Sequence, residues 1–135
     1  MVTVPEKIEL YSHAGVFCCP SIYEPFGIIN LEAMACETAV VASAVGGIKE
    51  VVLPGETGWL VPLAQMSETP FEALHPETFS RDLAERINEL MADPAMRAAF
   101  GKAGRARAEE LFGWKAIAHQ VRDLYARLID SRCSA

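Results

Sequence analysis

Short apolar runs alternate with helical patterns in the first half of the chain, and this alternation restricts the fold more than any other feature. The apolar runs cover residues 14–19, 38–43 and 57–62, which are typical strand lengths. Continuous apolar runs of this kind indicate strands that are covered on both faces of a parallel sheet. Helical patterns over residues 27–37 and 48–53 separate the runs. Strands that alternate with helices predict an α/β fold with a parallel sheet.

Helices are also expected on either side of this alternating segment. Residues 5–13 have the pattern of a short helix with a proline near its start. A surface loop is expected over residues 63–75, which are rich in Pro, Ser, Thr and Glu. Three helices then follow, from Pro76, from Pro94 to about residue 112, and from Trp114. Apolar stripes mark the first and the last of them, at Phe79, Leu83, Ile87, Leu90 and Met91 and at Trp114, Ile117, Val121, Leu124, Tyr125 and Leu128.

The composition is that of a single globular domain. Of the 135 residues, 51% are hydrophobic and 22% are charged, which allows a real core. The net charge is −6 and no basic stripe is visible, so nucleic-acid binding is not expected. Lysine and arginine gather over residues 97–107, where we expect a solvated helix face. Three strands are few for a parallel sheet, so further sheet, another domain or a second copy is expected to cover the remaining apolar surface.

The sequence indicates a cytoplasmic protein. Its apolar runs are shorter than the roughly 18 residues of a membrane span, and its first residues do not form a signal-peptide pattern. Cys18, Cys19, Cys36 and Cys133 lack Cys-x-x-Cys spacing, which predicts reduced thiols. The three histidines are scattered, so no metal site is expected.

Two carboxylates lie close to the start of the helix at residues 27–37. Glu24 is in the preceding loop, Glu32 lies on the helix, and Gly27 opens it. Leu31 and Met34, together with Ala35, are expected to face inward. The start of a helix attracts phosphate, and carboxylates accept hydrogen bonds from sugar hydroxyls. The spacing alone leaves two interpretations open: a sugar-nucleotide clamp, or an ordinary pair of glutamates favoured by the helix dipole and the solvent.

A second candidate is the glycine pair Gly46-Gly47, which follows the second predicted strand. In an open α/β sheet, ligands bind outside the carboxyl ends of the strands, so this turn could approach a ligand held by Glu24. A plain tight turn is the competing interpretation. The chain has no Gly-x-Gly-x-x-Gly motif, Walker-type phosphate loop or Gly-x-Ser-x-Gly motif.

Several ordered motifs together resemble one family. They read Pro20-Ser-x-x-Glu24-Pro-Phe-Gly-x-x-x-x-Glu32-Ala-Met-Ala, Val40-Val-Ala-Ser, Val45-Gly-Gly-Ile-x-Glu-Val-Val, Gly55-Glu-Thr-Gly-Trp-Leu-Val-Pro62 and, in the tail, Asp93-Pro-x-x-Arg97, Gly101-x-Ala-Gly-Arg105 and Phe112-x-Trp114. The chain is similar over nearly its whole length to the C-terminal domain of retaining GT-B glycosyltransferases. The bacterial glycogen synthase-like enzymes of group 1, with their Glu-x7-Glu motif, are the subgroup it resembles most.

The resemblance implies a fold, an activity and roles for individual residues. Residues 1–135 would form the second half of a Rossmann-like parallel-sheet domain, followed by helices. The family transfers a sugar from a nucleoside diphosphate donor with retention and usually without a metal. By position, Glu24 would contact the donor sugar and stabilise the transition state, and Glu32 would hold the ribose. The remaining implied donor contacts are the backbone of Phe26, Gly27 and Ile28 and the turn at Gly46 and Gly47.

The resemblance also implies parts that this sequence does not contain. A complete enzyme has an N-terminal acceptor domain and basic residues that neutralise the donor diphosphate, and Lys49 stands where the family often has proline. The last helix, from Trp114, would pack toward that domain. We therefore expect a fragment that is inactive alone. Its expected substrates are ADP-glucose or UDP-glucose as donor, and an α-glucan or glucose 1-phosphate as acceptor.

Two other interpretations stay open. The chain could be a stand-alone nucleotide-sugar binding or assembly module without catalysis, a homo-oligomer formed through its exposed helices. It could also be an unrelated flavodoxin-like module, in which case the ordered motifs would be a coincidence.

Overall fold

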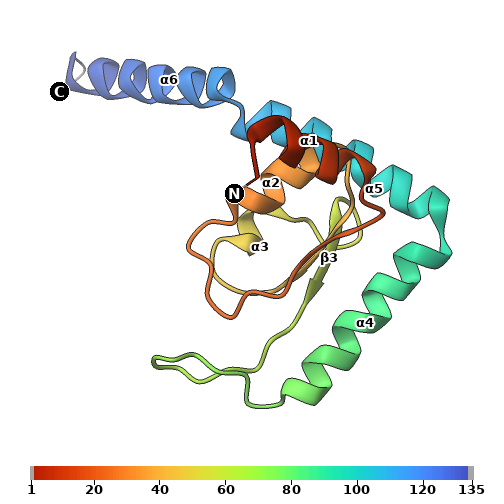
Figure 1. Ribbon diagram of the computed structural model, residues 1–135. Coiled ribbons are helices and arrows are strands. Elements are labelled where there is room, and N and C mark those ends of the chain that lie inside the picture. Colours follow the sequence, from red (N-terminus) through yellow and green to blue (C-terminus); the bar gives the residue numbers. More distant parts are fainter. Residues whose placement is uncertain (1, 134–135) are drawn as a thin grey trace.

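The computed structural model describes residues 2–133 (Figure 1). Strands and helices follow the predicted order, and each strand is shorter than its apolar run. The elements are α1 (Val4–His13), β1 (Phe17–Cys19), α2 (Ile28–Ala35), β2 (Val40–Ser43), α3 (Ile48–Val51), β3 (Gly58–Val61), α4 (Pro76–Ala92), α5 (Pro94–Arg107), the π-helix η1 (Ala108–Phe112) and α6 (Trp114–Cys133). The expected helix from Pro94 to about Phe112 is present, with π-helical hydrogen bonding in its last turn.

The three strands form one parallel sheet in the order β1-β2-β3. Val40 in β2 lies opposite Phe17 in β1 and Gly58 in β3. All four residues of β2 are buried, as expected for a central strand. The prediction that β1 is covered on both faces was wrong, because Cys18 is exposed while Cys19 is buried. On the Cys18 face, α4 packs mainly on β2 and β3, and Cys18 stays exposed.

Helices cover the sheet from both sides and make two hydrophobic clusters. One cluster joins alternate residues of β2, such as Val40 and Ala42, to α2 and α3. The other joins Val41 to Leu90 of α4 and Phe100 of α5. Side chains of successive strand residues point to opposite faces, so these clusters lie on opposite sides of the sheet. The predicted α/β architecture is confirmed.

Two predicted inward stripes need correction. In α2 the buried residues are Asn30, Ala33 and Met34, whereas Ala35 is exposed. These three buried residues lie on one face of the helix. Ala35 follows Met34 directly, so its side chain is rotated about 100° away from that of Met34 around the helix axis. The same rotation from the buried Leu90 of α4 leaves Met91 53% exposed.

The predicted solvated face at residues 97–107 is also partly wrong. The guanidinium of Arg107 donates to the carbonyl oxygens of Val51 (2.9 Å) and Glu50 (2.8 Å), at the end of α3. Arg97 donates to the carbonyl oxygen of Leu90 at 3.1 Å. A charged side chain that satisfies the last carbonyls of a helix stabilises that end.

The last helix, α6, projects away from the layered body (Figure 1). Trp114 at its start is 90% exposed, and much of its predicted stripe is exposed as well. The side chain of Cys133 lies outside the described ones. Across the described residues, each helix is too short or too polar to cross a membrane.

Candidate active site

The loop that carries Glu24 and the Gly46-Gly47 turn lie against each other, at the strand ends where the sequence predicted both of them. They follow β1 and β2, whose carboxyl ends meet at one edge of the parallel sheet. The backbone N–H of Gly47 donates to the carbonyl oxygen of Glu24 at 3.1 Å. This contact brings the two candidate segments into one site.

Neither glycine of the turn can carry a side chain in this arrangement. A Cβ at Gly46, where φ is +45°, would lie 2.0 Å from the carbonyl oxygen of Glu24. A Cβ at Gly47 would lie 2.5 Å from Cα of Phe26. The close approach of the two loops therefore explains why both positions are glycine. Contact between these glycines and a ligand stays a prediction.

Other polar groups fix the backbone of the same loop. The buried hydroxyl of Ser43 donates to the carbonyl oxygen of Ser21. The side-chain amide of Gln65 donates to the carbonyl oxygen of Ile22 at 2.9 Å. The loop is thus held through its carbonyl groups by β2, by the segment after β3 and by Gly47.

The carboxylate of Glu24 lies at the start of α2. Its Oε1 accepts from the backbone N–H of Gly27 at 3.1 Å, and the side chain is half-buried. Gly27 is the N-cap residue with φ +97°, a conformation that favours glycine. The sequence pattern predicted that Glu24 would be near this helix end, and it is.

The first turn of α2 is open to solvent on one side. Phe26 is 39% exposed and Ile28 is 61% exposed, while Gly27 between them is buried. The N–H groups at the first positions of a helix have no intrahelical acceptor and carry a partial positive charge. The start of α2 can therefore bind an anion such as a phosphate. The carboxylate of Glu24 beside it can accept hydrogen bonds from hydroxyl groups.

Glu32 is not a plain surface residue. Its Oε1 accepts from Nζ of Lys7 at 2.6 Å, and its Oε2 accepts from the hydroxyl of Tyr11 at 3.3 Å. Both partners come from α1, and the sequence did not reveal them. They lie four residues apart on one helix, which places them on one face, but which helix they meet depends on tertiary packing.

Burial of Tyr11 raises the pKa of its hydroxyl, and the negative charge of Glu32 raises it further. The protonated hydroxyl is the form that donates to the carboxylate. Metal ligands are not grouped in the described part of the chain: three neighbouring His, Cys, Asp or Glu side chains do not occur there.

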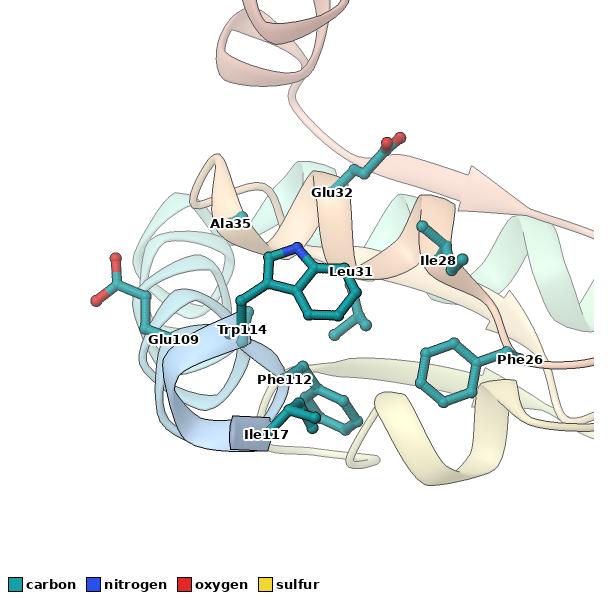
Figure 2. A pocket seen from close by; sticks show the side chains of 11 residues that line it. Phe26, Ile28, Leu31, Glu32, Ala35, Glu109, Phe112, Trp114 and Ile117 are labelled. Atoms are coloured by element: carbon teal, nitrogen blue, oxygen red, sulfur yellow. The ribbon is translucent and has the colours of Figure 1, made fainter. Parts of the chain in front are cut away.

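A groove of about 540 Å³ runs beside α2 (Figure 2). Phe26 and Phe112 meet edge to face in it, with ring centroids 6.1 Å apart, and Glu32 points away from these rings. The sequence did not predict this groove, because its walls come from distant segments. Its lining residues are Phe26, Ile28, Leu31, Glu32, Ala35, Ala108, Glu109, Phe112, Gly113, Trp114 and Ile117.

Residues 2–69 match the protein family described as glycosyl transferases, group 1. An alpha-maltose-1-phosphate synthase of Mycobacterium tuberculosis is 49% identical over 127 residues, which are 94% of this chain and 31% of that protein. A D-inositol 3-phosphate glycosyltransferase of Kineococcus radiotolerans is 39% identical over 137 residues, covering 96% of this chain and 28% of that protein. The chain thus spans less than a third of the length of either relative.

Solved structures with the same fold include larger proteins and one separate domain. A sucrose-phosphate synthase of Thermosynechococcus elongatus has a TM-score of 0.68 and 45% identity, over 90% of this chain and 27% of that one. The Anabaena protein HepE, solved with UDP-glucose, has a TM-score of 0.69 and 28% identity, over 90% and 30% of the two chains. The C-terminal domain of a group 1 protein of Francisella tularensis, at 24% identity and a TM-score of 0.67, shares the fold over 84% of this chain and 51% of that one.

Proposed function

The chain belongs to the group 1 glycosyltransferases, and from this premise we propose that it forms the donor-binding part of a retaining glycosyltransferase. Its fold is that of GT-B C-terminal domains. Residues 1–135 would be a part of such a domain. The observation that carries the proposal is the meeting of Glu24, the Gly46-Gly47 turn and the start of α2 at the carboxyl ends of β1 and β2.

Each predicted site residue has a role in this proposal. Glu24 contacts the donor sugar and stabilises the transition state. The backbone of Phe26, Gly27 and Ile28 holds sugar hydroxyls and phosphate at the helix start, and Glu32 holds the ribose. Gly46 and Gly47 line the donor beside Glu24. The shared loop contact and the open first turn of α2 support this assignment.

The proposed donor is a glucose nucleotide, UDP-glucose or ADP-glucose. Support comes from HepE, a structural relative that was solved with UDP-glucose. The proposed acceptor is an α-glucan or glucose 1-phosphate, as in glycogen synthesis. Three relatives carry a phosphorylated sugar or polyol in their names, which favours the phosphorylated acceptor over the glucan. Transfer would need an acceptor wall and cations for the diphosphate from an N-terminal domain.

We place the protein in the cytoplasm. Cys18, Cys19 and Cys36 are free thiols, which is usual in a reducing compartment.

The assignment is tested by calorimetric titration of the chain with UDP, ADP and their glucose conjugates. The Glu24→Gln variant should weaken binding of the glucose conjugates and leave binding of the free nucleotides unchanged. Glu85→Gln, at an exposed position on α4, is the matched control. Measurable binding of UDP-glucose that is equal in the Glu24→Gln variant and the parent chain would contradict the role of Glu24.

The alternative is a stand-alone nucleotide-sugar binding module that oligomerises through its exposed helices. The exposed apolar residues of α6 favour it. Donor binding tighter than about 0.1 mM, or about −5.5 kcal/mol, by this chain alone would support that alternative. Undetectable binding would instead support a part that needs the rest of a GT-B enzyme.

A further inference from the structure

The carboxylate of Glu32 is held by two side chains of one helix. Nζ of Lys7 lies 2.6 Å from Oε1, and the hydroxyl of Tyr11 lies 3.3 Å from Oε2. The side chains of Lys7 and Glu32 are 39% and 32% exposed, so the pair is at the surface but partly covered. Each carboxylate oxygen therefore has one protein donor.

Tyr11 is itself fixed to the body of the molecule. Its ring packs edge to face on Phe17 of β1, with centroids 5.3 Å apart, and its carbonyl oxygen accepts from the buried hydroxyl of Thr38 at 2.6 Å. None of the residues of α1 is fully buried. The attachment at Tyr11 therefore determines how α1 meets Glu32.

The two contacts leave the carboxylate able to bind a ligand. An ionised carboxylate has about four acceptor positions, so each oxygen keeps room for another hydroxyl donor. A free glutamate side chain loses rotamer freedom when it binds, and one already held in place loses less. We propose that Lys7 and Tyr11 are positioning residues, which orient the Glu32 carboxylate toward the two adjacent hydroxyls of a ribose.

This inference rests on the proposed role of Glu32. It adds α1 to the donor site, whereas the family motif places that site on the loop after β1 and on α2. It also assigns a function to the Lys7–Glu32 ion pair. This pair would otherwise contribute little to the stability of the fold, since exposed pairs stabilise a fold by less than about 1 kcal/mol.

The test compares nucleotides with and without the ribose hydroxyls. Titration of the full chain with UDP and ADP, and with their 2′,3′-dideoxy analogues, measures the preference for the ribose. Lys7→Met should reduce this preference about tenfold and Tyr11→Phe about threefold, because hydrogen bonds to a charged group are among the stronger ones. Binding of the dideoxy analogues should not change. Lys102→Met and Tyr125→Phe, at exposed positions on α5 and α6, are the matched controls.

Glu32→Gln separates this inference from the proposed function. A loss of ribose preference in Glu32→Gln, with unchanged preference in Lys7→Met and Tyr11→Phe, would overturn the positioning role and keep the donor site. Unchanged preference in Glu32→Gln, or measurable binding by the parent chain that is equal for the ribose and dideoxy nucleotides, would overturn both.

A second measurement needs no ligand. Ultraviolet titration of the tyrosines, with Tyr11→Phe to assign the signal, reports the charge beside the Tyr11 hydroxyl. Glu32→Gln should lower the pKa of Tyr11, since the negative charge of Glu32 raises it. An unchanged pKa would show that the two groups do not meet in solution and would overturn the positioning role.

Discussion

At the scale of single residues, the site depends on positions where little space is left. The sequence predicted a turn at Gly46 and Gly47 from their place after a strand. The structure shows why both residues of this turn are glycine. The backbone of the neighbouring loop occupies the volume that a Cβ would need. The same sequence could not reveal Lys7 or Tyr11, because their contacts depend on how α1 packs against α2.

Replacement of Gly46 should test this close packing. Gly46→Ala places a methyl group 2.0 Å from the carbonyl oxygen of Glu24, at a φ of +45°. We expect a loss of stability of about 2–4 kcal/mol, which combines steric overlap with backbone strain. Gly55→Ala is the control, because φ is also positive there but the added Cβ would make only ordinary contact with Trp59. Equal losses in urea unfolding would contradict a role for the overlap.

Tyr11 gives the stability a dependence on high pH. Its pKa is raised in the folded protein, so the folded state keeps the phenolic proton more firmly than the unfolded chain does. The associated stability is present below the unfolded pKa of about 10 and is lost as the pH rises through the folded pKa. The urea midpoint should fall less between pH 9 and about 11 in Tyr11→Phe than in the parent or in Tyr125→Phe. Parallel curves would contradict this account.

At the scale of elements, strands and helices were predictable because each has a local signal. Apolar runs marked β1 to β3, and Pro76 and Asp93-Pro94 marked the starts of α4 and α5. Strand ends and inward faces were less certain, since they depend on neighbours. The open face at Cys18 is an example, because α4 packs mainly on β2 and β3. The π-helical turn at Ala108 has no signal in the sequence that we can identify.

The contact between α5 and α3 can be tested at Arg107. Arg107→Met keeps most of the aliphatic stem and removes the guanidinium that binds the carbonyl oxygens of Glu50 and Val51. We expect a loss of about 1–3 kcal/mol in urea unfolding, because a charged donor to two carbonyls is removed. Arg105→Met is the control and should cost less than about 1 kcal/mol, as its ion pairs are exposed. Similar losses in the two variants would mean that the carbonyl contacts do not stabilise the fold.

At the scale of the whole molecule, we expect the sheet to be more stable against local opening than α6. The sheet is enclosed by two hydrophobic clusters, whereas residues 118–131 of α6 are all exposed. The sequence predicted the apolar stripe of this helix correctly, and it also predicted that another surface would cover part of it. The family resemblance implies that an N-terminal domain would cover it.

Hydrogen exchange should separate these regions. Amides of α6 beyond Gln120 should exchange by local opening, at least about a hundredfold faster than those of β2, because few contacts hold the helix. Mass spectrometry at two protein concentrations checks the result. Strong protection of α6 that increases with concentration would mean instead that a second copy covers it.

The way the loop after β1 is held has a consequence for how this site can diversify. The carbonyl groups of this loop accept hydrogen bonds from Ser43, Gln65 and Gly47. These hydrogen bonds do not involve the side chains of Ile22 and Tyr23, which are exposed. The Tyr23 ring also stacks on Phe71, with centroids 5.6 Å apart. The residue at position 22 can therefore be exchanged without loss of the frame that places Glu24. A library randomised at position 22 would explore substrate preference on a constant scaffold.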